Sequence, residues 1–269
     1  MSSAATTPAP TGSARLGAPA TGVLVTGGAS GIGRATALAL AEVGRPVMVW
    51  DLNAEGAAET TRDCRERYGT VAEWAGVDVG DSAALPEAVA AAEASLGSLG
   101  GFVHAAGVAG AMTVDAIDEE TWDSTLGVNL KSAVMITKAL TGPFERAGAG
   151  SAIVLVSSVE GLFGSSVLTA YCASKGGVLG VMRSIAQHFG ILGIRANAIC
   201  PGAVDTPMLA PALSLPGFRG QLEQRTPMGR LAEPAEIARP IRFLLSEEAS
   251  FVTGAYLTVD GGLTSITAI

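Results

Sequence analysis

The sequence predicts a single-domain α/β protein, with a doubly wound parallel sheet of about seven strands and helices on both of its faces. Three observations lead to this prediction. Short apolar runs alternate along the chain with segments of helical composition. A glycine-rich turn joins the first apolar run to the first helix. The apolar runs are continuous, as in residues 152–156, and such strands are typical of a parallel sheet covered on both faces.

The predicted elements follow one another in a regular order. Strand 22–26 leads into the glycine turn, and the helix that follows over 34–43 stops at Gly44. Strand 46–50 then closes on Asp51 and completes the first strand–helix–strand unit. The alternation continues with helices 54–67, 82–95, 119–140, 169–189 and 234–245, and with strands 70–77, 102–105, 152–156, 195–199 and 255–259.

One domain is expected to contain all of these elements. The sequence has no interior linker, repeat or break in composition, so residues 21–269 are predicted to fold together. Residues 1–20 are rich in Ala, Thr, Pro and Ser, and they lack a basic segment followed by an apolar one. They therefore predict a disordered tail and not a signal peptide.

Composition and charge argue against several classes of protein. Apolar residues make up 48% of the chain and charged residues only 16%, which allows a large core. The apolar stretches are shorter than the roughly 18 residues of a spanning helix, so we expect no membrane partner. A net charge of −8 argues against a nucleic-acid partner.

The cysteines and histidines point to a reducing location and to the absence of a metal. Three cysteines at wide spacing favour a cytoplasmic protein without a disulfide framework: Cys64, Cys172 and Cys200. The two histidines, His104 and His188, are not paired with cysteines at ligand spacing, so we expect no zinc site.

The glycine-rich turn predicts a binding site for a pyrophosphate. Gly27, Gly31 and Gly33 stand between a strand and a helix, where backbone N–H groups and the helix N-terminus can face negative charge. Their spacing, G-x3-G-x-G, differs from the G-x-G-x-x-G fingerprint, so a tight turn without a ligand is the alternative interpretation. The position directly after the first strand favours the binding site.

The end of the second strand predicts which dinucleotide is bound. Asp51 follows Gly33 by 18 residues, close to the spacing of about 20 at which a carboxylate holds the adenosine ribose. Such a carboxylate favours NAD and repels the 2′-phosphate of NADP. Neither Ser30 nor Leu52 offers a cation to that phosphate, and Arg34 is interpreted as a solvated helix residue. We therefore expect NAD as the cofactor.

Tyr171 and Lys175 are the candidate catalytic pair. They stand four residues apart in the predicted helix 169–189, so both side chains lie on one face of it. A phenol has a reference pKa of about 10. A nearby ammonium and the positive charge of an oxidised cofactor would lower the pKa of Tyr171 and favour the phenolate. Taken alone, the pair is far more typical of an amphipathic helix face than of a catalytic site.

Together these features resemble the short-chain dehydrogenase/reductase superfamily in its compact single-domain form, over residues 22–262. Five motifs carry the resemblance: Thr26-Gly27-Gly28-Ala29-Ser30-Gly31-Ile32-Gly33, the Tyr171/Lys175 pair, Ser158 thirteen residues before Tyr171, Val128-Asn129-Leu130, and Pro201-Gly202-Ala203-Val204-Asp205-Thr206. The resemblance implies a Rossmann-like fold, a homotetramer, and a catalytic tetrad of Asn129, Ser158, Tyr171 and Lys175. It also implies cofactor contacts from Gly27, Ser30, Gly31, Ile32, Gly33, Asp51, Leu52, Asp78, Val79, Ala106, Gly107, Tyr171, Lys175, Pro201, Val204 and Thr206.

In the implied reaction, Tyr171 takes the alcohol proton while a hydride leaves the same carbon for the nicotinamide, and Ser158 holds the substrate oxygen. Asn129 is a poor helix former inside the predicted helix 119–140, and a local distortion there would explain it. The sequence departs from the family at His104, where an Asn is frequent. This puts a hydrogen bond that stabilises the sheet in doubt, and we interpret His104 as a structural residue at a strand end.

The segment 207–227 is apolar, rich in proline and outside the alternation of strands and helices. It predicts a lid over the substrate, and an apolar helix packed on a neighbouring subunit is the alternative. The pocket residues would be Val108, Glu160, Leu162, Phe163, Met208 and Leu209. Glu160 is the polar exception and is interpreted as a residue of the rim more readily than as a substrate anchor.

The sequence therefore predicts an NAD-dependent oxidoreductase that interconverts a secondary alcohol and a ketone with a hydrophobic body. A 3-oxoacyl-thioester (acyl carrier protein) reductase is the alternative among enzymes, although it would more naturally use NADPH. A catalytically silent NAD-binding regulator is the alternative outside enzymes, and the complete tetrad argues against it.

Overall fold

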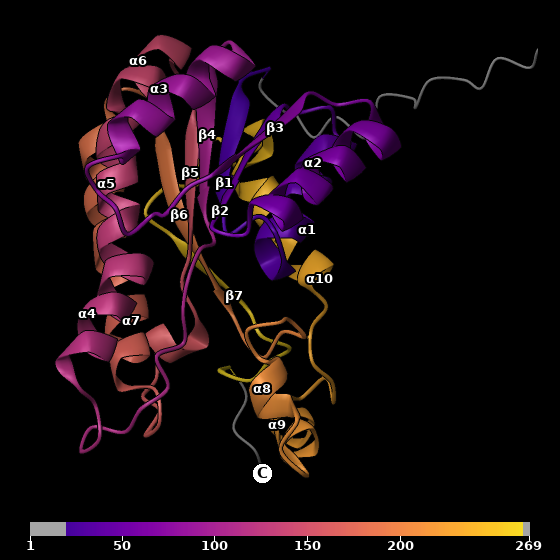
Figure 1. Cartoon of the computed structure of the whole chain (residues 1–269), viewed down its shortest axis with the longest axis vertical. Coiled ribbons are helices and arrows are strands. Elements are labelled where there is room, and N and C mark those ends of the chain that lie inside the picture. The colour runs from indigo at the N-terminus through magenta and orange to yellow at the C-terminus, as the bar shows by residue number, and fades with distance from the viewer. Residues whose placement is uncertain (1–19, 266–269) are drawn as a thin grey trace, which may run out of the picture.

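Seven parallel strands form one sheet in the order β3-β2-β1-β4-β5-β6-β7, in a computed structural model that describes residues 20–265 (Figure 1). The strands are β1 (Gly22–Thr26), β2 (Val47–Asp51), β3 (Ala72–Gly76), β4 (Leu99–His104), β5 (Ala152–Val156), β6 (Arg195–Pro201) and β7 (Tyr256–Val259). The chain builds outward from β1 to β3 and then returns to place β4 on the other side of β1. Ligands of such sheets bind where the strand order reverses, which here is the carboxyl end of β1 and β4.

Helices cover both faces of the sheet, so that each strand contributes to two cores. One face carries α1 (Gly31–Glu42), α2 (Ala54–Tyr68) and α10 (Pro234–Leu244). The other carries α3 (Leu85–Leu96), α4 (Glu119–Leu126), α5 (Ser132–Ala139), α6 (Thr141–Ala147) and α7 (Thr169–Gly190). Val23 and Val25 pack in the first core, whereas Leu24 packs in the second. The predicted doubly wound fold is therefore confirmed.

The predicted helix 119–140 is wrong as a single α-helix. A five-residue π-helical segment, Gly127–Lys131, separates α4 from α5, and α6 follows α5. Asn129 lies in this segment. The distortion that the sequence led us to expect at Asn129 is thus present, and single π-turns of this kind are frequent at functional sites.

Other elements differ from the prediction mainly at their ends. α1 begins at Gly31, three residues before the predicted start, because the glycine turn passes directly into the helix. α3 begins at Leu85, since turns closed by Asp78 and Asp81 occupy the preceding residues. The predicted tail 1–20, apart from residue 20, and residues 266–269 lie outside the described part of the chain.

Two short helices, α8 (Ala210–Leu213) and α9 (Phe218–Arg225), come from the predicted lid segment. Figure 1 shows them below the carboxyl end of β7, with α4 and the start of α7 on the opposite side of the molecule. The carboxyl ends of the central strands thus lie between two sets of helices.

Two buried arginines hold the C-terminal end of α10 against the amino end of the sheet. Arg45, just before β2, donates from Nη1 to the carbonyl of Leu245, at 2.9 Å. Arg195, the first residue of β6, donates to the carbonyls of Leu244 at 2.7 Å and Ser246 at 3.0 Å. Burial, and then the charge of Arg195, lower the pKa of Arg45 to about 10. The carbonyls at the C-terminus of α10, which carry partial negative charge, take the place of a carboxylate partner.

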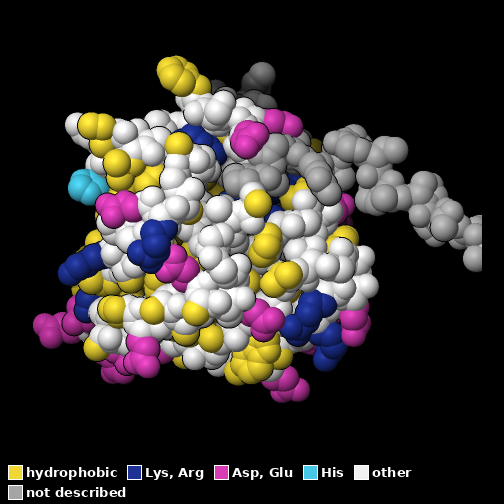
Figure 2. Space-filling view, turned by 90° about the horizontal axis from the view of Figure 1, so that it is seen from above, with side chains coloured by type: hydrophobic (Ala, Val, Ile, Leu, Met, Phe, Trp, Pro, Cys, Tyr) yellow, Lys and Arg dark blue, Asp and Glu magenta, His cyan; other side chains and the backbone are white. Residues whose placement is uncertain are grey.

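The face at the amino ends of the strands is seen in Figure 2. On the coloured part of this face, acidic and basic side chains are mixed among apolar and uncharged ones, and acidic side chains lie beside the basic ones. Among residues 20–265, no helix combines the length and the apolar character that crossing a bilayer requires.

Candidate active site

The glycine turn folds so tightly that the backbone itself forms the wall of the site. Gly27 and Gly31 have φ angles of 67° and 52°, a region that favours glycine. A Cβ placed on Gly33 would lie 2.1 Å from the carbonyl oxygen of Gly27, and one on Gly27 would lie 2.7 Å from the nitrogen of Ala106. The N-terminus of α1 opens here, with Ser30 as its N-cap. A backbone cradle without side chains beside a helix N-terminus fits a pyrophosphate.

Asp51 lies against this cradle. Its Oδ2 accepts a hydrogen bond from the backbone N–H of Ala29 at 3.0 Å, and its Oδ1 accepts one from Asn53 at 2.9 Å. The carboxylate is therefore held next to the glycine turn, where the ribose of an adenosine would be expected. Leu52, which follows it, is 74% exposed and carries no charge.

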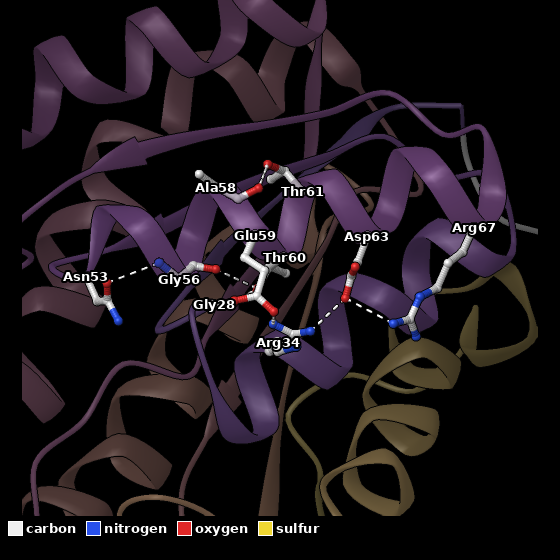
Figure 3. Close-up of polar contacts among 10 residues, drawn as sticks. All are labelled: Gly28, Arg34, Asn53, Gly56, Ala58, Glu59, Thr60, Thr61, Asp63 and Arg67. Atoms are coloured by element: carbon white, nitrogen blue, oxygen red, sulfur yellow. Dashed lines mark hydrogen bonds and ion pairs between the residues drawn. The ribbon is translucent and has the colours of Figure 1, made fainter.

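Arg34 is not the solvated helix residue that the sequence suggested. Its guanidinium contacts Glu59 at 3.2 Å and Asp63 at 2.6 Å, both on α2, as Figure 3 shows. In the same view Thr60 donates to the carbonyl of Gly28 at 3.0 Å, which fixes the glycine turn to α2. Because Arg34 on α1 pairs with two carboxylates on α2, its charge is already neutralised at the contact between these two helices.

The other predicted cofactor residues mostly follow the carboxyl ends of strands: Asp78 and Val79 after β3, Ala106 and Gly107 after β4, and Val204 and Thr206 after β6. Asp78 lines a cavity of about 620 Å³ between the β3–α3 loop and the π segment. A Cβ on Gly31 would lie 3.3 Å from the side chain of Thr206, which places Thr206 at the glycine turn. Val79 and Val204 are instead buried, at 7% and 6% exposure, and pack in the two cores. Ile32 is partly buried against the α1 side of the sheet.

The structure brings the four residues of the predicted tetrad to one end of the cleft. Nζ of Lys175 lies 5.5 Å from the centre of the Tyr171 ring and donates to the carbonyl of Val156 at 2.8 Å. A Cβ on Gly107 would lie 3.2 Å from Oδ1 of Asn129 and 3.6 Å from Nζ of Lys175, so both side chains border the cleft wall at Gly107.

Ser158 is oriented for the donation of a hydrogen bond. Its Oγ accepts from the backbone N–H of Glu160 at 3.1 Å, at the start of the 3-10 turn Val159–Gly161. This contact uses a lone pair and leaves the hydroxyl proton free to point toward Tyr171 or a substrate oxygen. The interaction with Ser158 also lowers the pKa of Tyr171.

Tyr171 does not have the lowered pKa that the sequence led us to expect. Burial is the largest influence on the phenol and, with a hydrogen bond from Ser158 acting the other way and Glu160 adding to it, raises its pKa to about 12. Burial also lowers the pKa of Lys175 to about 8. The lysine therefore does not lower the pKa of the phenol in the protein alone. The other charge expected to lower the pKa of Tyr171 is that of an oxidised nicotinamide.

His104 supplies the hydrogen bonds that its departure from the family put in doubt. Its Nδ1 lies 2.9 Å from Oγ1 of Thr26, and its Nε2 lies 3.2 Å from the carbonyl oxygen of Val128. Burial, followed by the charge of Lys175, lowers the pKa of His104 to about 3, so the ring is neutral near pH 7. Its role as a structural residue at a strand end is in accord with these contacts.

Ser157 and Ser174 were not singled out from the sequence, and Thr26 was named only as part of the glycine motif. Ser157 donates to the backbone carbonyl of Lys175 at 2.8 Å, and Ser174 lies 3.0 Å from Nδ2 of Asn129. Thr26 accepts hydrogen bonds from Ala105 and Ala106. A polar residue at the end of an apolar strand was the available signal for Thr26 and Ser157; nothing in the helix pattern distinguished Ser174.

Three of the predicted pocket residues expose apolar surface. Val108, Phe163 and Met208 are 38%, 56% and 47% exposed. Leu209 precedes α8 in the lid segment and is partly buried. Glu160 is half-buried, its Oε2 lies 4.0 Å from Sγ of Cys172, and burial raises its pKa.

The fold and the cleft define a nicotinamide-cofactor-dependent α/β oxidoreductase. A family model described as Enoyl-(Acyl carrier protein) reductase matches residues 27–264. The 2-(S)-hydroxypropyl-CoM dehydrogenase 3 of Xanthobacter autotrophicus is 38% identical over 91% of this chain and 96% of its own length. The cis-4-hydroxycyclohexanecarboxylate dehydrogenase of Sinomonas cyclohexanicum is 41% identical over 90% of this chain and 96% of its own.

A solved structure is also similar. The crystal structure of levodione reductase superposes with a TM-score of 0.87 at 32% identity, covering 92% of this chain and 98% of that one. The chain therefore belongs to the short-chain dehydrogenase/reductase superfamily, as the motifs indicated.

Proposed function

We propose that this protein is an NAD-dependent dehydrogenase/reductase that interconverts a secondary alcohol and a ketone, with Tyr171 as the general acid/base. The observation that carries the proposal is the convergence of Tyr171, Ser158 and Lys175 beside the glycine cradle. A screen of secondary alcohols with NAD, followed by the absorbance of the reduced cofactor, tests it. Absence of turnover over a broad set of apolar alcohols and ketones, with either dinucleotide, would reject it.

The residues of the chain divide the work of the reaction. The bound nicotinamide supplies the chemistry of hydride transfer. Ser158 donates a hydrogen bond to the substrate oxygen, and Tyr171 exchanges a proton with that oxygen. Lys175 donates to the Val156 carbonyl. Its ammonium and the positive charge of a bound oxidised nicotinamide would together stabilise negative charge on the phenol. Asn129 holds the wall of the cleft through the backbone of Val108.

Asp51 supports NAD as the cofactor. Its carboxylate would repel a 2′-phosphate, Ser30 and Leu52 are uncharged, and Arg34 is held by two carboxylates on α2. We expect Asp51→Asn to shift the NADP/NAD ratio of kcat/KM toward NADP by about 10- to 100-fold, because one charge at short range is removed. Steady-state kinetics with both cofactors measure the ratio.

The matched control for this change is Glu55→Gln, which removes an exposed carboxylate from the first turn of α2. It should leave the cofactor ratio unchanged. An unaltered ratio in Asp51→Asn would mean that Asp51 does not select the dinucleotide.

The substrate is proposed to have a hydrophobic body, with segment 207–227 closing over it as a lid. Exposed Val108, Phe163 and Met208 support an apolar pocket. The two relatives named above are, by their names, dehydrogenases of 2-(S)-hydroxypropyl-CoM and of cis-4-hydroxycyclohexanecarboxylate, and both names describe a secondary alcohol. A cyclic or branched secondary alcohol is therefore the first class to test.

Phe163→Ser is expected to raise KM for apolar alcohols by about tenfold with a smaller change in kcat, because a large apolar contact is lost. Phe251→Ser, at a fully exposed phenylalanine just before β7, is the control and should leave KM unchanged. Equal KM values for several apolar substrates in Phe163→Ser and the native protein would remove Phe163 from the pocket.

A 3-oxoacyl-thioester reductase is the second candidate, and a relative named 3-oxoacyl-[acyl-carrier-protein] reductase, 35% identical over 89% of this chain, favours it. It predicts NADPH-dependent reduction of acetoacetyl thioesters. The uncharged Ser30 and Leu52 argue against that cofactor. Comparing NADH and NADPH with one thioester and one simple ketone separates the two candidates.

We also propose a cytoplasmic homotetramer. All three cysteines are free thiols, which suits a reducing compartment. A groove of about 270 Å³ between α5 and α7, and the half-exposed Tyr256 and Leu257 on the edge strand β7, offer two separate apolar surfaces for subunit contacts. Multi-angle light scattering of the purified protein tests the tetramer, and a monomer or dimer would reject it.

A further inference from the structure

His104 is bonded on both sides of its ring, and its partners determine which nitrogen carries the hydrogen. The imidazole is fully buried at the last position of β4. The Val128 carbonyl near Nε2 can only accept, so Nε2 must donate. In a neutral ring Nδ1 then has no hydrogen, and it accepts from the hydroxyl of Thr26. The ring is a fixed connection with a donor at one end and an acceptor at the other.

The Thr26 end of this connection leads to the wall of the cofactor cleft. Oγ1 of Thr26 accepts the backbone N–H groups of Ala105 and Ala106, each at 3.2 Å. Its own hydrogen is left for Nδ1 of His104. Thr26 thus joins β1 to the segment that runs from His104 to Gly107, which borders both Asn129 and Lys175.

The Nε2 end leads to the π segment. The Val128 carbonyl accepts from Nε2 of His104 and from the hydroxyl of Ser132, whose Oγ also lies 3.1 Å from Nε2. Side-chain donors thus bond a carbonyl of the segment in which the regular helical pattern is interrupted. Asn129 follows Val128 directly.

Asn129 makes a second connection between the π segment and the cleft wall. Its Oδ1 accepts from the N–H of Val108 at 2.8 Å, and its Nδ2 donates to the carbonyl of Val108 at 2.9 Å. The cleft wall 105–108 and the π segment are therefore joined twice, once through His104 and once through Asn129. Loss of one connection leaves the wall attached at a single point.

We propose that His104 is a positioning residue: it holds the π segment, and with it Asn129, against the wall of the cofactor cleft. This inference rests on the proposed function, because the purpose of the wall is to place the cofactor and Tyr171 relative to each other. His104 itself touches neither.

Three substitutions separate the two ends of the connection. The amide of Gln reaches approximately the position of Nε2, whereas that of Asn reaches approximately the position of Nδ1. His104→Gln retains the bond to Val128, His104→Asn retains the bond to Thr26, and His104→Leu retains neither. We expect kcat to fall by about tenfold or more in the Asn and Leu variants, since a small misplacement of reacting groups costs that much. In the Gln variant most of the loss should be restored.

Hydrogen–deuterium exchange gives a readout that does not depend on turnover. Peptides covering 105–108 and 128–133 should exchange faster in the Asn and Leu variants than in the Gln variant, because the amide of Val108 is protected only while Asn129 stays in place. The control is Glu66→Gln, at an exposed residue of α2, which should match the native protein in both measurements.

Two results would overturn the inference. If all three variants lose thermal stability equally while kcat, measured well below the melting temperature, stays native, His104 only stabilises the sheet. If the Asn variant is native-like and the Gln variant is not, the bond to Thr26 and not that to the π segment is the important one. Failure of the native protein to oxidise any alcohol would reject the proposed function instead, and the exchange comparison would still decide on the connection between the π segment and the wall.

Discussion

Replacing Tyr171 by Phe is expected to lower kcat by about 100- to 10,000-fold, the range that a general acid/base contributes. The change deletes one hydroxyl and keeps the ring, so the packing of α7 beside Lys175 should persist. Affinity for NADH, followed by fluorescence titration, should change little. The steady-state rate of alcohol oxidation, compared with that of the native protein at the same cofactor saturation, measures the effect.

Tyr68→Phe is the matched control, because Tyr68 ends α2 at the surface, is 41% exposed and is remote from the cleft. It should have native kcat. Turnover in Tyr171→Phe at the native rate, with cofactor bound, would show that the proton is exchanged elsewhere and would remove Tyr171 from the mechanism.

Replacing Gly33 by Ala is expected to have the second large effect, this time on the cofactor. The added Cβ would lie 2.1 Å from the Gly27 carbonyl oxygen and 2.6 Å from its carbon, which are backbone atoms that no side-chain rotation can move. The glycine turn must therefore open. We expect KM for NAD to rise at least about 100-fold, and stability to fall by about 1–3 kcal/mol from overpacking.

Gly190→Ala provides the control for this substitution. Gly190 is also a helical glycine, the last residue of α7, and a Cβ there would meet no atom within 4 Å. It should bind NAD normally and be as stable as the native protein or slightly more so. A Gly33→Ala protein with native affinity for NAD and a native melting temperature would contradict the proposed pyrophosphate cradle.

The fold could be predicted because its signals are local and repeated. Continuous apolar strands such as Ala152–Val156 are separated by helices long enough to cross a sheet face, and the structure has all seven strands in the expected places. The π segment could be anticipated only at Asn129, whose side chain suits an interrupted helix better than a regular one. The donors from His104 and Ser132 that bond the Val128 carbonyl within it could not be seen in a linear pattern.

Motif spacing predicted which side chains lie at the site. It did not predict the pKa values there, because burial determines them. The spacing of Tyr171 and Lys175 placed both side chains at the cleft. The pKa of Tyr171 could not be read in the same way, because the cost of burying the phenolate exceeds the effect of a lysine held by Val156. Arg34 was misjudged for a related reason: its partners Glu59 and Asp63 lie 25 and 29 residues further along the chain.

The two arginines at the amino end of the sheet bear on how the protein is made. Arg45 and Arg195 have acceptors late in the chain, at Leu245 and at Leu244 and Ser246, and Arg45 also donates from Nε to the carbonyl of Thr21. In a nascent polypeptide that has left the ribosome only as far as β6, Arg195 has none of these carbonyls and Arg45 has only that of Thr21. Since an unpaired buried cation is costly, the domain is expected to close only after residues 244–246 have been translated.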